Sequence, residues 1–424
     1  MSNQCVVIEK SMPLHGEAQL AGAKNAVLVI IASLILASGK SRLTSVPVSD
    51  DVYNMIALLN NLGAQTQFDA EHGILDVDTS TITSYTVSPE IMKKMRASIL
   101  VMGPLLARFR KANVALPGGC VLGARPIDYH LRAFAKMGAT IEMAQDYIKA
   151  SAPNFHAERL ILEYPSVGAT ENIIMAAALT PGKTTIVNAA IEPEVLDLIE
   201  IMAKMGAQIR ITPPATIEIE GVKELKPTEH AIMLDRLEAG SLMLAAAMTG
   251  GSISLPTAPA WSMETFNEKL CDMGHTITVG SRGIGLTFTA TKYPKAVSIK
   301  TMPYPGFPTD LQAPMLAAQC LADGVSTIHE TVYENRLVHV RELQKMGAQI
   351  TIDGQIATIK GTDTLYGAHV IAPDIRASAA LVIAGLAAQG QTVMTGIHHL
   401  HRGYQDFEKK IAALGGKIYI RDIE

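Results

Sequence analysis

The sequence predicts an α/β protein of two domains, each an inside-out α/β barrel with apolar helices at its centre and sheets outside. Three observations predict this fold class. A helix that ends at Leu-Gly or Met-Gly recurs six times, an apolar helix stands upstream of it, and a hairpin pattern follows it. The glycines lie 68 to 75 positions apart, a spacing that fits a whole folded unit and exceeds that of a solenoid repeat. They are Gly63, Gly138, Gly206, Gly274, Gly347 and Gly415.

The composition sets the class of protein. A chain of 424 residues, 48% hydrophobic and 18% charged, is long enough for two well-buried domains. A net charge of −4 gives no general attraction to nucleic acid or to anionic membranes. The N-terminus lacks the pattern of a signal peptide, and the longest apolar run, 26–37, is too short to span a bilayer. Four widely spaced cysteines form no metal or disulfide pattern, so we expect a cytoplasmic protein with no membrane insertion.

Each repeated unit begins with an alanine-rich helix that is apolar on nearly all faces, so we expect it to be buried against its equivalents. A glycine and a β-branched strand follow, then a loop and an amphipathic helix closed by the Leu/Met-Gly pair. A hairpin such as AQITIDGQIATIKG completes the unit. The unit therefore reads helix, strand, helix and two strands. The six apolar helices are AVLVIIASLILA, ASILVMGPLLARF, ENIIMAAALT, SLMLAAAMT, LQAPMLAAQCLA and ASAALVIAGLAA.

We expect the two ends of the chain to belong to one domain. The sixth hairpin pattern is cut short at Glu424, and we expect the N-terminal strand around Val6–Glu9 to supply the missing partner. Three units per domain then place the first domain at 22–233, and the second at 1–21 plus 234–424.

The second unit departs from the repeat. Lys111 stands where the other units have a glycine, and the strand-to-helix loop LPGGCVLGARPIDYH is longer than its equivalents. Gly118 and Gly119 give this loop conformational freedom, and Arg125 can lower the pKa of the Cys120 thiol. A lone cysteine is more often buried and inert. The insertion and the glycine pair favour a reactive thiol here.

Cations stand where several of the apolar helices begin. Lys24 and Asn25 in GAKNAV, Arg96 in MRAS and Arg376 in IRAS each precede an apolar run. A helix N-terminus with an added cation attracts anions, and the recurrence of the pattern points to a shared, strongly anionic ligand. Each residue alone would most often be a solvated surface group. Asp310, in FPTDLQA, occupies the matching position of the fifth unit, where an acid is either a helix cap or a catalytic base.

The segment HHLHRGY is expected to be the sixth strand-to-helix loop, equivalent to the loop of Cys120. It carries Arg402, for which a solvated surface role remains equally open. Its histidines, His398, His399 and His401, have no fourth ligand nearby. We predict no metal site.

The motifs LAGAKNAVL, MRAS, LPGGCVLGARPIDYH, SVGAT, FPTDLQA, VYENR and IRASA occur in this order. Together they resemble the UDP-N-acetylglucosamine enolpyruvyl transferases, most clearly over 22–404. The resemblance implies two domains of three units with the active site in the cleft between them. It also implies transfer of the enolpyruvyl group of phosphoenolpyruvate to the sugar 3-hydroxyl, through a tetrahedral ketal that releases phosphate. This reaction commits the sugar to peptidoglycan synthesis and needs small-molecule substrates but no cofactor.

The resemblance also assigns roles to residues. Cys120 is the general acid, Asp310 accepts the proton of the sugar hydroxyl, and Lys24 and Arg402 complete the catalytic set. Phosphoenolpyruvate is held by Lys24, Arg125 and Arg402, with Asn25 and Arg376 nearby. The nucleotide sugar is contacted by Arg96, Arg125, Pro126, Ile127, Asp128, Tyr129, Ser166, Val167, Gly168, Asp310 and Val332.

Two departures from the family pattern leave alternatives open. Tyr164-Pro165 stands where the family has lysine, and Ile191 replaces the arginine of its Arg-Glu-Pro-Glu segment. Transfer to another nucleotide sugar therefore remains an alternative. Transfer to shikimate 3-phosphate is disfavoured, since those enzymes lack the cysteine loop and have Lys-Ser in place of Lys24-Asn25. A non-catalytic nucleotide-sugar-binding paralogue is disfavoured by the retained catalytic set. The oligomeric state is left unknown by the sequence.

Overall fold

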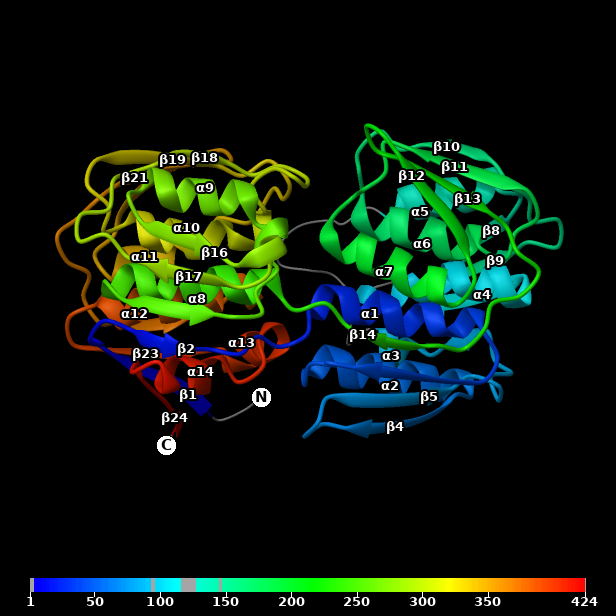
Figure 1. The fold of residues 1–424 in the computed structure, drawn as a ribbon, viewed down its shortest axis with the longest axis horizontal. Helices are drawn as coiled ribbons and strands as arrows, with labels where there is room; N and C mark the ends of the chain where they lie inside the picture. The colour runs from blue at the N-terminus through cyan, green and yellow to red at the C-terminus, as the bar shows by residue number, and fades with distance from the viewer. Residues whose placement is uncertain (1–3, 93–95, 116–126, 145–146, 424) are drawn as a thin grey trace. The chain divides into compact units, whose positions relative to one another are not determined.

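A computed structural model describes residues 4–92, 96–115, 127–144 and 147–423, with the side chains of 91, 92 and 96–98 left out. The described chain forms two compact units (Figure 1). One lies within Gly22–Met233 and is called the 22–233 unit below. The other combines Met1–Ala21 with Leu234–Glu424 and is called the C-terminal unit.

Apolar helices lie at the centre of each unit, as the sequence predicts. In the 22–233 unit they are α1 (Lys24–Ser33), α4 (Met102–Phe109) and α6 (Val167–Ala177), extended by 3₁₀ turns at Leu34–Leu36 and Arg96–Val101. In the C-terminal unit they are α8 (Arg236–Thr249), α10 (Gln312–Gln319) and α12 (Ile375–Ala387), which pack against one another. Every residue of α1 from Ala26 onwards is buried, because the helix has no polar face to expose.

An amphipathic helix covers the centre in each repeated unit. The first, α2, begins after Ser49, whose hydroxyl accepts the backbone N–H of Val52, and it ends at Gly63. Gly63 has a φ of 107°, a left-handed conformation that favours glycine. The six helices are α2 (Asp50–Leu62), α5 (Asp128–Lys136), α7 (Pro193–Lys204), α9 (Glu264–Asp272), α11 (Val340–Lys345) and α14 (Phe407–Ala413).

Three four-stranded sheets surround the helices of the 22–233 unit. The first has the order β14 (Glu229–Ala231), β3 (Lys40–Thr44), β5 (Ile74–Asp78) and β4 (Gln65–Asp69). The second has β6 (Thr86–Val87), β7 (Lys111–Ala115), β9 (Tyr147–Ser151) and β8 (Thr140–Ala144). The third has β10 (Arg159–Ile161), β11 (Lys183–Val187), β13 (Thr216–Glu220) and β12 (Gln208–Thr212).

The C-terminal unit repeats this arrangement. Its first sheet has the order β2 (His15–Glu17), β15 (Ser252–Leu255), β17 (Leu286–Thr289) and β16 (Thr276–Val279). The second has β18 (Ile299–Lys300), β19 (Val325–His329), β21 (Ile356–Lys360) and β20 (Gln349–Asp353). The third has β22 (His369–Ile371), β23 (Gln391–Thr395), β1 (Gln4–Glu9) and β24 (Lys417–Asp422).

The first strand of each sheet comes from another repeat and was missed by the sequence prediction. β6 follows the hairpin of the first repeat and pairs in parallel with β7 of the second, with Thr86 opposite Asn113. β10 links the second repeat to the third in the same way, and β14 returns to β3 and closes the ring. Strands of two or three residues carry no alternation that a sequence pattern can reveal.

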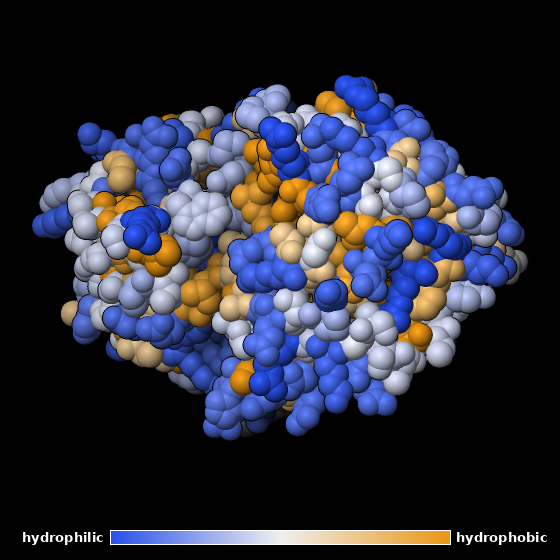
Figure 2. Space-filling model, turned by 45° about the vertical axis from the view of Figure 1, so that its right-hand side comes forward, coloured by the Kyte–Doolittle hydropathy of each residue, from blue (hydrophilic) through white to orange (hydrophobic). Residues whose placement is uncertain are grey.

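The N-terminal strand completes the sixth hairpin, as predicted. β1 pairs antiparallel with β24, with Val6 opposite Ile420. The outer strands alternate buried and exposed positions, as in β3, where Ser41 and Leu43 are buried and Arg42 is exposed. On the face shown in Figure 2, hydrophilic and hydrophobic residues are interspersed. Within the described ranges, no helix has the length and apolar character needed to cross a membrane.

Candidate active site

Lys24 is the first residue of α1, at the helix start where the sequence places it. Its Nζ lies 2.9 Å from Oδ2 of Asp51, and the two side chains are 13% and 4% exposed. Asp51 belongs to the first turn of α2, so this ion pair connects the starts of two helices. Asn25 follows in α1 and is exposed. A positive side chain at a helix N-terminus is suited to bind an anion.

The starts of α5 and α6 bring together two of the segments assigned to the nucleotide sugar. Ile127, Asp128 and Tyr129 lie at the beginning of α5, while Ser166, Val167 and Gly168 begin α6. The hydroxyl of Ser166 caps α6 by accepting the backbone N–H of Ala169.

Two side chains that the sequence interpretation missed, His130 and Asn172, connect these helix starts. Nδ2 of Asn172 donates to Nδ1 of His130 at 2.9 Å and to the carbonyl of Ile99, and its Oδ1 accepts the N–H of Gly103. Burial lowers the pKa of His130 to about 4, against a smaller opposing effect of Asp128, so the ring is neutral at physiological pH. Both residues are buried and polar, but each stands beside other polar residues in the sequence, so no local pattern singles it out.

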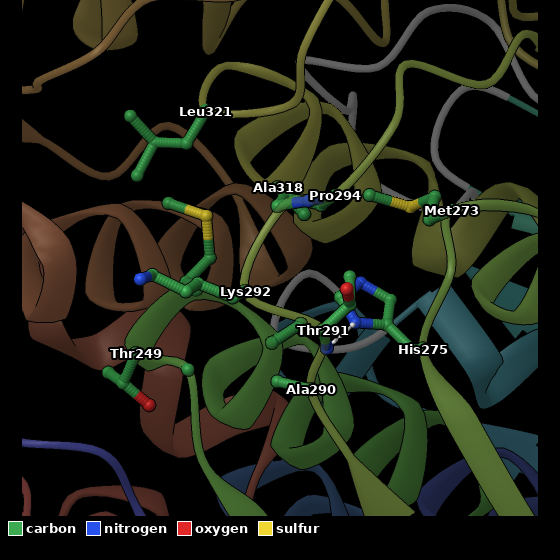
Figure 3. A pocket seen from close by; sticks show the side chains of 12 residues that line it. Thr249, Met273, His275, Ala290, Thr291, Lys292, Pro294, Ala318 and Leu321 are labelled. Atoms are coloured by element: carbon green, nitrogen blue, oxygen red, sulfur yellow. Dashed lines mark hydrogen bonds between the residues drawn. The ribbon is translucent and has the colours of Figure 1, made fainter.

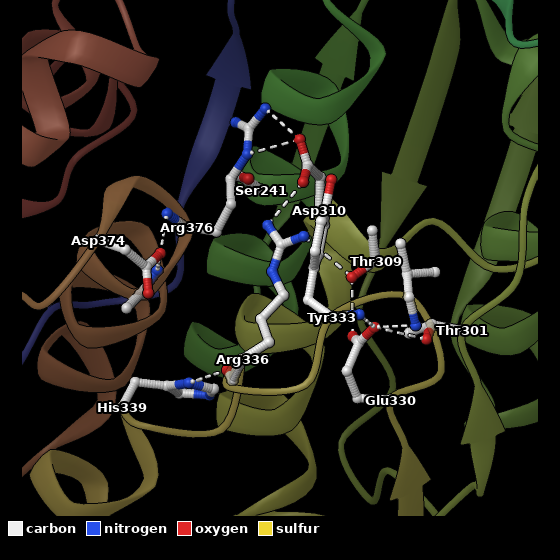
Figure 4. Close-up of polar contacts among 12 residues, drawn as sticks. Ser241, Thr301, Thr309, Asp310, Glu330, Tyr333, Arg336, His339, Asp374 and Arg376 are labelled. Carbon is white, nitrogen blue, oxygen red and sulfur yellow. Dashed lines mark hydrogen bonds and ion pairs between the residues drawn. The ribbon is translucent and has the colours of Figure 1, made fainter. Parts of the chain in front are cut away.

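Asp310 lies in the 3₁₀ turn Thr309–Leu311, directly before α10, and is held by two arginines (Figure 4). Its Oδ1 accepts from Nη2 of Arg336 at 2.6 Å, and its Oδ2 accepts from Nη2 and Nε of Arg376 at 2.8 and 3.1 Å. The two arginine side chains are 3% and 4% exposed, and that of Asp310 is 24% exposed. Burial alone raises the pKa of Asp310, but the two guanidinium groups outweigh it and hold that pKa well below its ordinary value.

A fully buried acid, Glu330, supports this cluster. Its Oε1 accepts from the hydroxyl of Thr301 and from the backbone N–H groups of Val332 and Tyr333, and its Oε2 accepts from the hydroxyl of Thr309. The Thr309 hydroxyl in turn accepts from Nη1 of Arg336 at 2.9 Å. Glu330 thereby fixes the backbone at Val332, assigned to the nucleotide sugar, to the turn that carries Asp310; Figure 4 shows Glu330 and Thr309 in this cluster.

Arg376 is the second residue of α12, whose first N–H groups are capped by Asp374. Its guanidinium carbon lies 5.2 Å from the centre of the Tyr404 ring, and the Tyr404 hydroxyl is 2.9 Å from that of Ser241. Nη1 of Arg376 is buried and has no hydrogen-bond partner among the described residues. Nε of Arg336 is likewise buried without a hydrogen-bond partner among the described residues, so two N–H donors of the cluster are unused.

Arg402 lies in α13 (Ile397–Gly403), between β23 and α14. The prediction of a loop for this segment is wrong, because the chain forms two helical turns there. His398 and His399 pack ring to ring with centroids 4.1 Å apart. Across the described residues, no group of three His, Cys, Asp or Glu side chains is placed to hold a metal ion.

Several assigned residues fall outside this description. Cys120, Arg125 and Pro126 lie outside the described residues, and Arg96 is described only by its backbone in the turn Arg96–Val101. Arg336, Glu330 and Thr309 were not assigned from the sequence. Arg336 is the last residue of the motif VYENR, and that motif is the sequence signal from which it could have been identified.

The fold agrees with comparisons to known proteins. The sequence model of EPSP synthase (3-phosphoshikimate 1-carboxyvinyltransferase) matches residues 8–411, which defines the class as enolpyruvyl transferase. UDP-N-acetylglucosamine 1-carboxyvinyltransferase 1 of Caldanaerobacter subterraneus subsp. tengcongensis is 49% identical over 97% of this chain and 98% of its own. The UDP-N-acetylglucosamine 1-carboxyvinyltransferase of Cellvibrio japonicus is 46% identical over the same shares. The chain therefore belongs to the EPSP synthase family and, within it, to the UDP-N-acetylglucosamine 1-carboxyvinyltransferases.

Solved structures share the fold. The enolpyruvyl transferase NikO from Streptomyces tendae has a TM-score of 0.89 at 22% identity, with 98% of each chain covered. EPSP synthase from Acinetobacter baumannii has a TM-score of 0.78 at 16% identity, with 99% of each chain covered. At these identities the likeness supports the two-unit α/β fold and nothing finer.

Proposed function

We propose that this protein transfers the enolpyruvyl group of phosphoenolpyruvate to the 3-hydroxyl of UDP-N-acetylglucosamine and releases phosphate. One observation carries the proposal: relatives named for this transfer are 44 to 49% identical to the chain over 97% of its length. The reaction commits the sugar to peptidoglycan synthesis. A cytoplasmic location, expected from the composition, remains a prediction.

Phosphoenolpyruvate carries a phosphate and a carboxylate, and its binding requires several fixed cations. Lys24 at the start of α1, Arg402 in α13 and Arg125 are proposed to supply them, with Asn25 beside Lys24. The ion pair with Asp51 holds the Lys24 ammonium in place before the substrate arrives. The unused N–H of Arg376 supports its assignment to the same substrate, since an oxygen of phosphoenolpyruvate can accept it.

The first step is an addition. Cys120 is proposed to protonate the terminal methylene carbon while the sugar hydroxyl oxygen attacks the neighbouring carbon. The attacking oxygen loses its proton to Asp310, which gives a tetrahedral ketal. In the second step the carbon–oxygen bond to phosphate breaks and the methyl group gives a proton back to the Cys120 thiolate, which restores the double bond.

The two arginines set how Asp310 works. Because they hold its pKa well below the ordinary value, the carboxylate is ionised at neutral pH but is a weak base. An alcohol gives up its proton to such a base only once its oxygen has begun to bond to carbon and has become acidic. We therefore expect proton transfer to Asp310 to accompany carbon–oxygen bond formation rather than to precede it.

The nucleotide sugar is proposed to contact the starts of α5 and α6 and the Val332 backbone, together with Arg96, Arg125 and Pro126. The hydrogen bonds of Asn172 keep the two helix starts in fixed positions before binding. Tyr164 and Ile191, which depart from the family pattern, bear on the choice of sugar rather than on the reaction.

A turnover assay tests the proposal. Phosphate should be released from phosphoenolpyruvate with UDP-N-acetylglucosamine as acceptor and not with shikimate 3-phosphate. Asp310→Asn should reduce kcat strongly and keep nucleotide binding, whereas Asp353→Asn, at an exposed hairpin position, should change neither. Release with shikimate 3-phosphate alone would contradict the assignment.

Cys120 can be tested separately. The epoxide fosfomycin should add its mass to the peptide that contains Cys120. Cys271 is an exposed thiol without an assigned role and serves as the internal control. Equal modification of both cysteines, or of Cys271 only, would contradict an activated thiol at Cys120.

A further inference from the structure

One buried side chain departs from the sixfold repeat and has no part in the proposed reaction. The residue after the Leu/Met-Gly pair is alanine in four units and Gly416 in the sixth, but it is His275 in the fourth. The four alanines, Ala64, Ala139, Ala207 and Ala348, are all buried. The scaffold therefore needs only a small side chain at this position, and the imidazole is an addition peculiar to one unit.

The hydrogen bonding of His275 fixes which ring nitrogen carries the proton. The side chain is 4% exposed and packs on the Phe288 ring at 5.2 Å between centroids. The backbone N–H of Thr291 donates to Nδ1 at 3.1 Å, so Nδ1 is unprotonated. Burial lowers the pKa of His275 to about 4, and the neutral ring carries its single proton on Nε2. Nε2 is buried and has no hydrogen-bond partner within the described part of the chain.

A cavity of about 390 Å³ adjoins this imidazole (Figure 3). Its volume lies within the range of small-molecule sites. Its walls are polar and apolar in about equal measure and come from the end of α8, the turn after α9, the segment after β17 and the end of α10. The apolar part is formed by residues that include Met248, Met273, Ala290, Ala318 and Leu321.

The cavity also has a positive charge at its rim. Lys292 lines it and is exposed, with its ammonium 5.2 Å from the centre of the Tyr293 ring. The N–H of His275 requires an acceptor, Lys292 favours a negative one, and the apolar part of the wall suits a compact apolar body. We propose that this cavity binds a small carboxylic acid with a compact apolar body, its carboxylate accepting from His275 Nε2 and facing Lys292.

The cavity is separate from the Asp310 cluster. It lies at the C-terminal ends of α8 and α10, where Thr249 and Ala318 line it. Asp310 precedes the opposite end of α10, a helix of eight residues that spans about 12 Å. A bound acid therefore contacts the far ends of two helices that support the cluster, and it does not enter the cluster itself.

Calorimetric titration with 4-methylpentanoate tests the site, with the alcohol 4-methylpentan-1-ol as the uncharged probe. The acid should bind about tenfold more tightly than the alcohol, because only the acid presents a charged acceptor. Lys292→Gln should remove most of this difference. Lys295→Gln, at a nearby exposed lysine that does not line the cavity, should keep it.

Two further variants test the Nε2–H donor of His275 and the volume of the cavity. His275→Asn offers an amide oxygen to the Thr291 N–H but no donor at the Nε2 position, so it should weaken the acid about tenfold while the protein stays folded. Ala290→Leu should fill the cavity and abolish binding of both probes. If His275→Asn does not fold, Lys292→Gln and Ala290→Leu decide the question.

Binding at the phosphoenolpyruvate site is distinguished by Lys24→Met. An acid bound there would be lost in Lys24→Met and retained in Lys292→Gln. That pattern, or affinity unchanged by Ala290→Leu, overturns the proposal. Because the cavity variants lie outside the proposed transfer site, loss of acid binding with full turnover supports the second site whatever the transfer assay shows.

Discussion

Replacing Arg336 with methionine should destabilise the C-terminal unit, because it removes one of the two guanidinium groups that hold Asp310. The Arg336 side chain is 3% exposed and donates to Asp310 Oδ1 at 2.6 Å and to Thr309 Oγ1 at 2.9 Å. Methionine retains an unbranched apolar chain of comparable length, so the variant removes the charge and the donors more than the packing.

The magnitude follows from burial. Removing one partner of a buried ion pair costs about 3–5 kcal/mol, because the other charge is left uncompensated. Asp310 is 24% exposed and keeps Arg376, so we expect the lower end of that range. In a unit of about 210 residues, a loss of about 3 kcal/mol lowers the melting temperature by roughly 6–12 °C.

The effect should depend on pH with a definite sign. Burial raises the pKa of Asp310, but Arg376 and Arg336 together hold it well below its ordinary value. Such a carboxyl stabilises the fold above its unfolded-state pKa, and the contribution is lost as the pH falls through the folded-state pKa. The difference in unfolding free energy between the wild type and Arg336→Met should therefore be full at neutral pH and should shrink below a pH of about 4.

Calorimetric unfolding at pH 7 and at the lowest pH that keeps both proteins folded measures this difference. Arg341→Met is the matched control, since Arg341 is exposed in α11 and its replacement changes the net charge equally. Arg336→Lys keeps the charge with a different donor geometry and should give an intermediate loss. Equal shifts for Arg336→Met and Arg341→Met, or a loss that stays constant with pH, would refute the reasoning.

Three other variants probe the 22–233 unit. Burial and two nearby glutamates raise the pKa of Glu171 well above its ordinary value, so ionisation opposes folding as the pH rises. Glu171→Gln should accordingly raise the melting temperature at pH 8 and change it little near pH 4, and the same calorimetry at both pH values checks this. Asn172→Ala should lose about 1–3 kcal/mol of stability and raise KM for the nucleotide sugar more than it lowers kcat, as steady-state kinetics would show. Lys24→Met should raise KM for phosphoenolpyruvate and lower the melting temperature, because Asp51 loses its 2.9 Å partner; unchanged values of both would contradict its assignment.

The repeat allowed much of the fold to be predicted from the sequence. A glycine that ends a helix, a fully apolar helix and an alternating hairpin each have a local cause, so each can be recognised in the sequence of every repeat. The linking strands β6, β10 and β14 have no such cause. They form because a strand of the next repeat offers a free edge, as β7 does to Thr86–Val87, and this depends on the assembled ring.

The residues of the candidate site also differ in whether a local sequence pattern predicts them. Lys24 and Asp310 were predicted because a charged residue before an apolar helix is visible in the sequence. Their partners were not, because Asp51 and Arg336 reach them only through tertiary packing. The helix α13 was missed for a related reason. Its seven residues follow Gly396, include three histidines and end at Gly403, a composition typical of a loop. The helix is stabilised by the burial of Ile397 and Leu400, which depends on tertiary packing.

A repeated scaffold makes buried polar groups easier to interpret. Where six units solve the same packing problem, a position that is small in five of them shows what packing requires there. The histidine at this position of the fourth unit accepts the Thr291 N–H at Nδ1, and its Nε2–H has no acceptor among the described residues. Burying such a donor without an acceptor opposes folding. The same comparison drew attention to the long loop of Cys120 in the sequence, for which we propose a role in the transfer reaction. We infer in the same way that the unused Nε2–H of His275 serves to bind a ligand in the adjoining cavity. The titration with 4-methylpentanoate tests whether the cavity binds a carboxylic acid there.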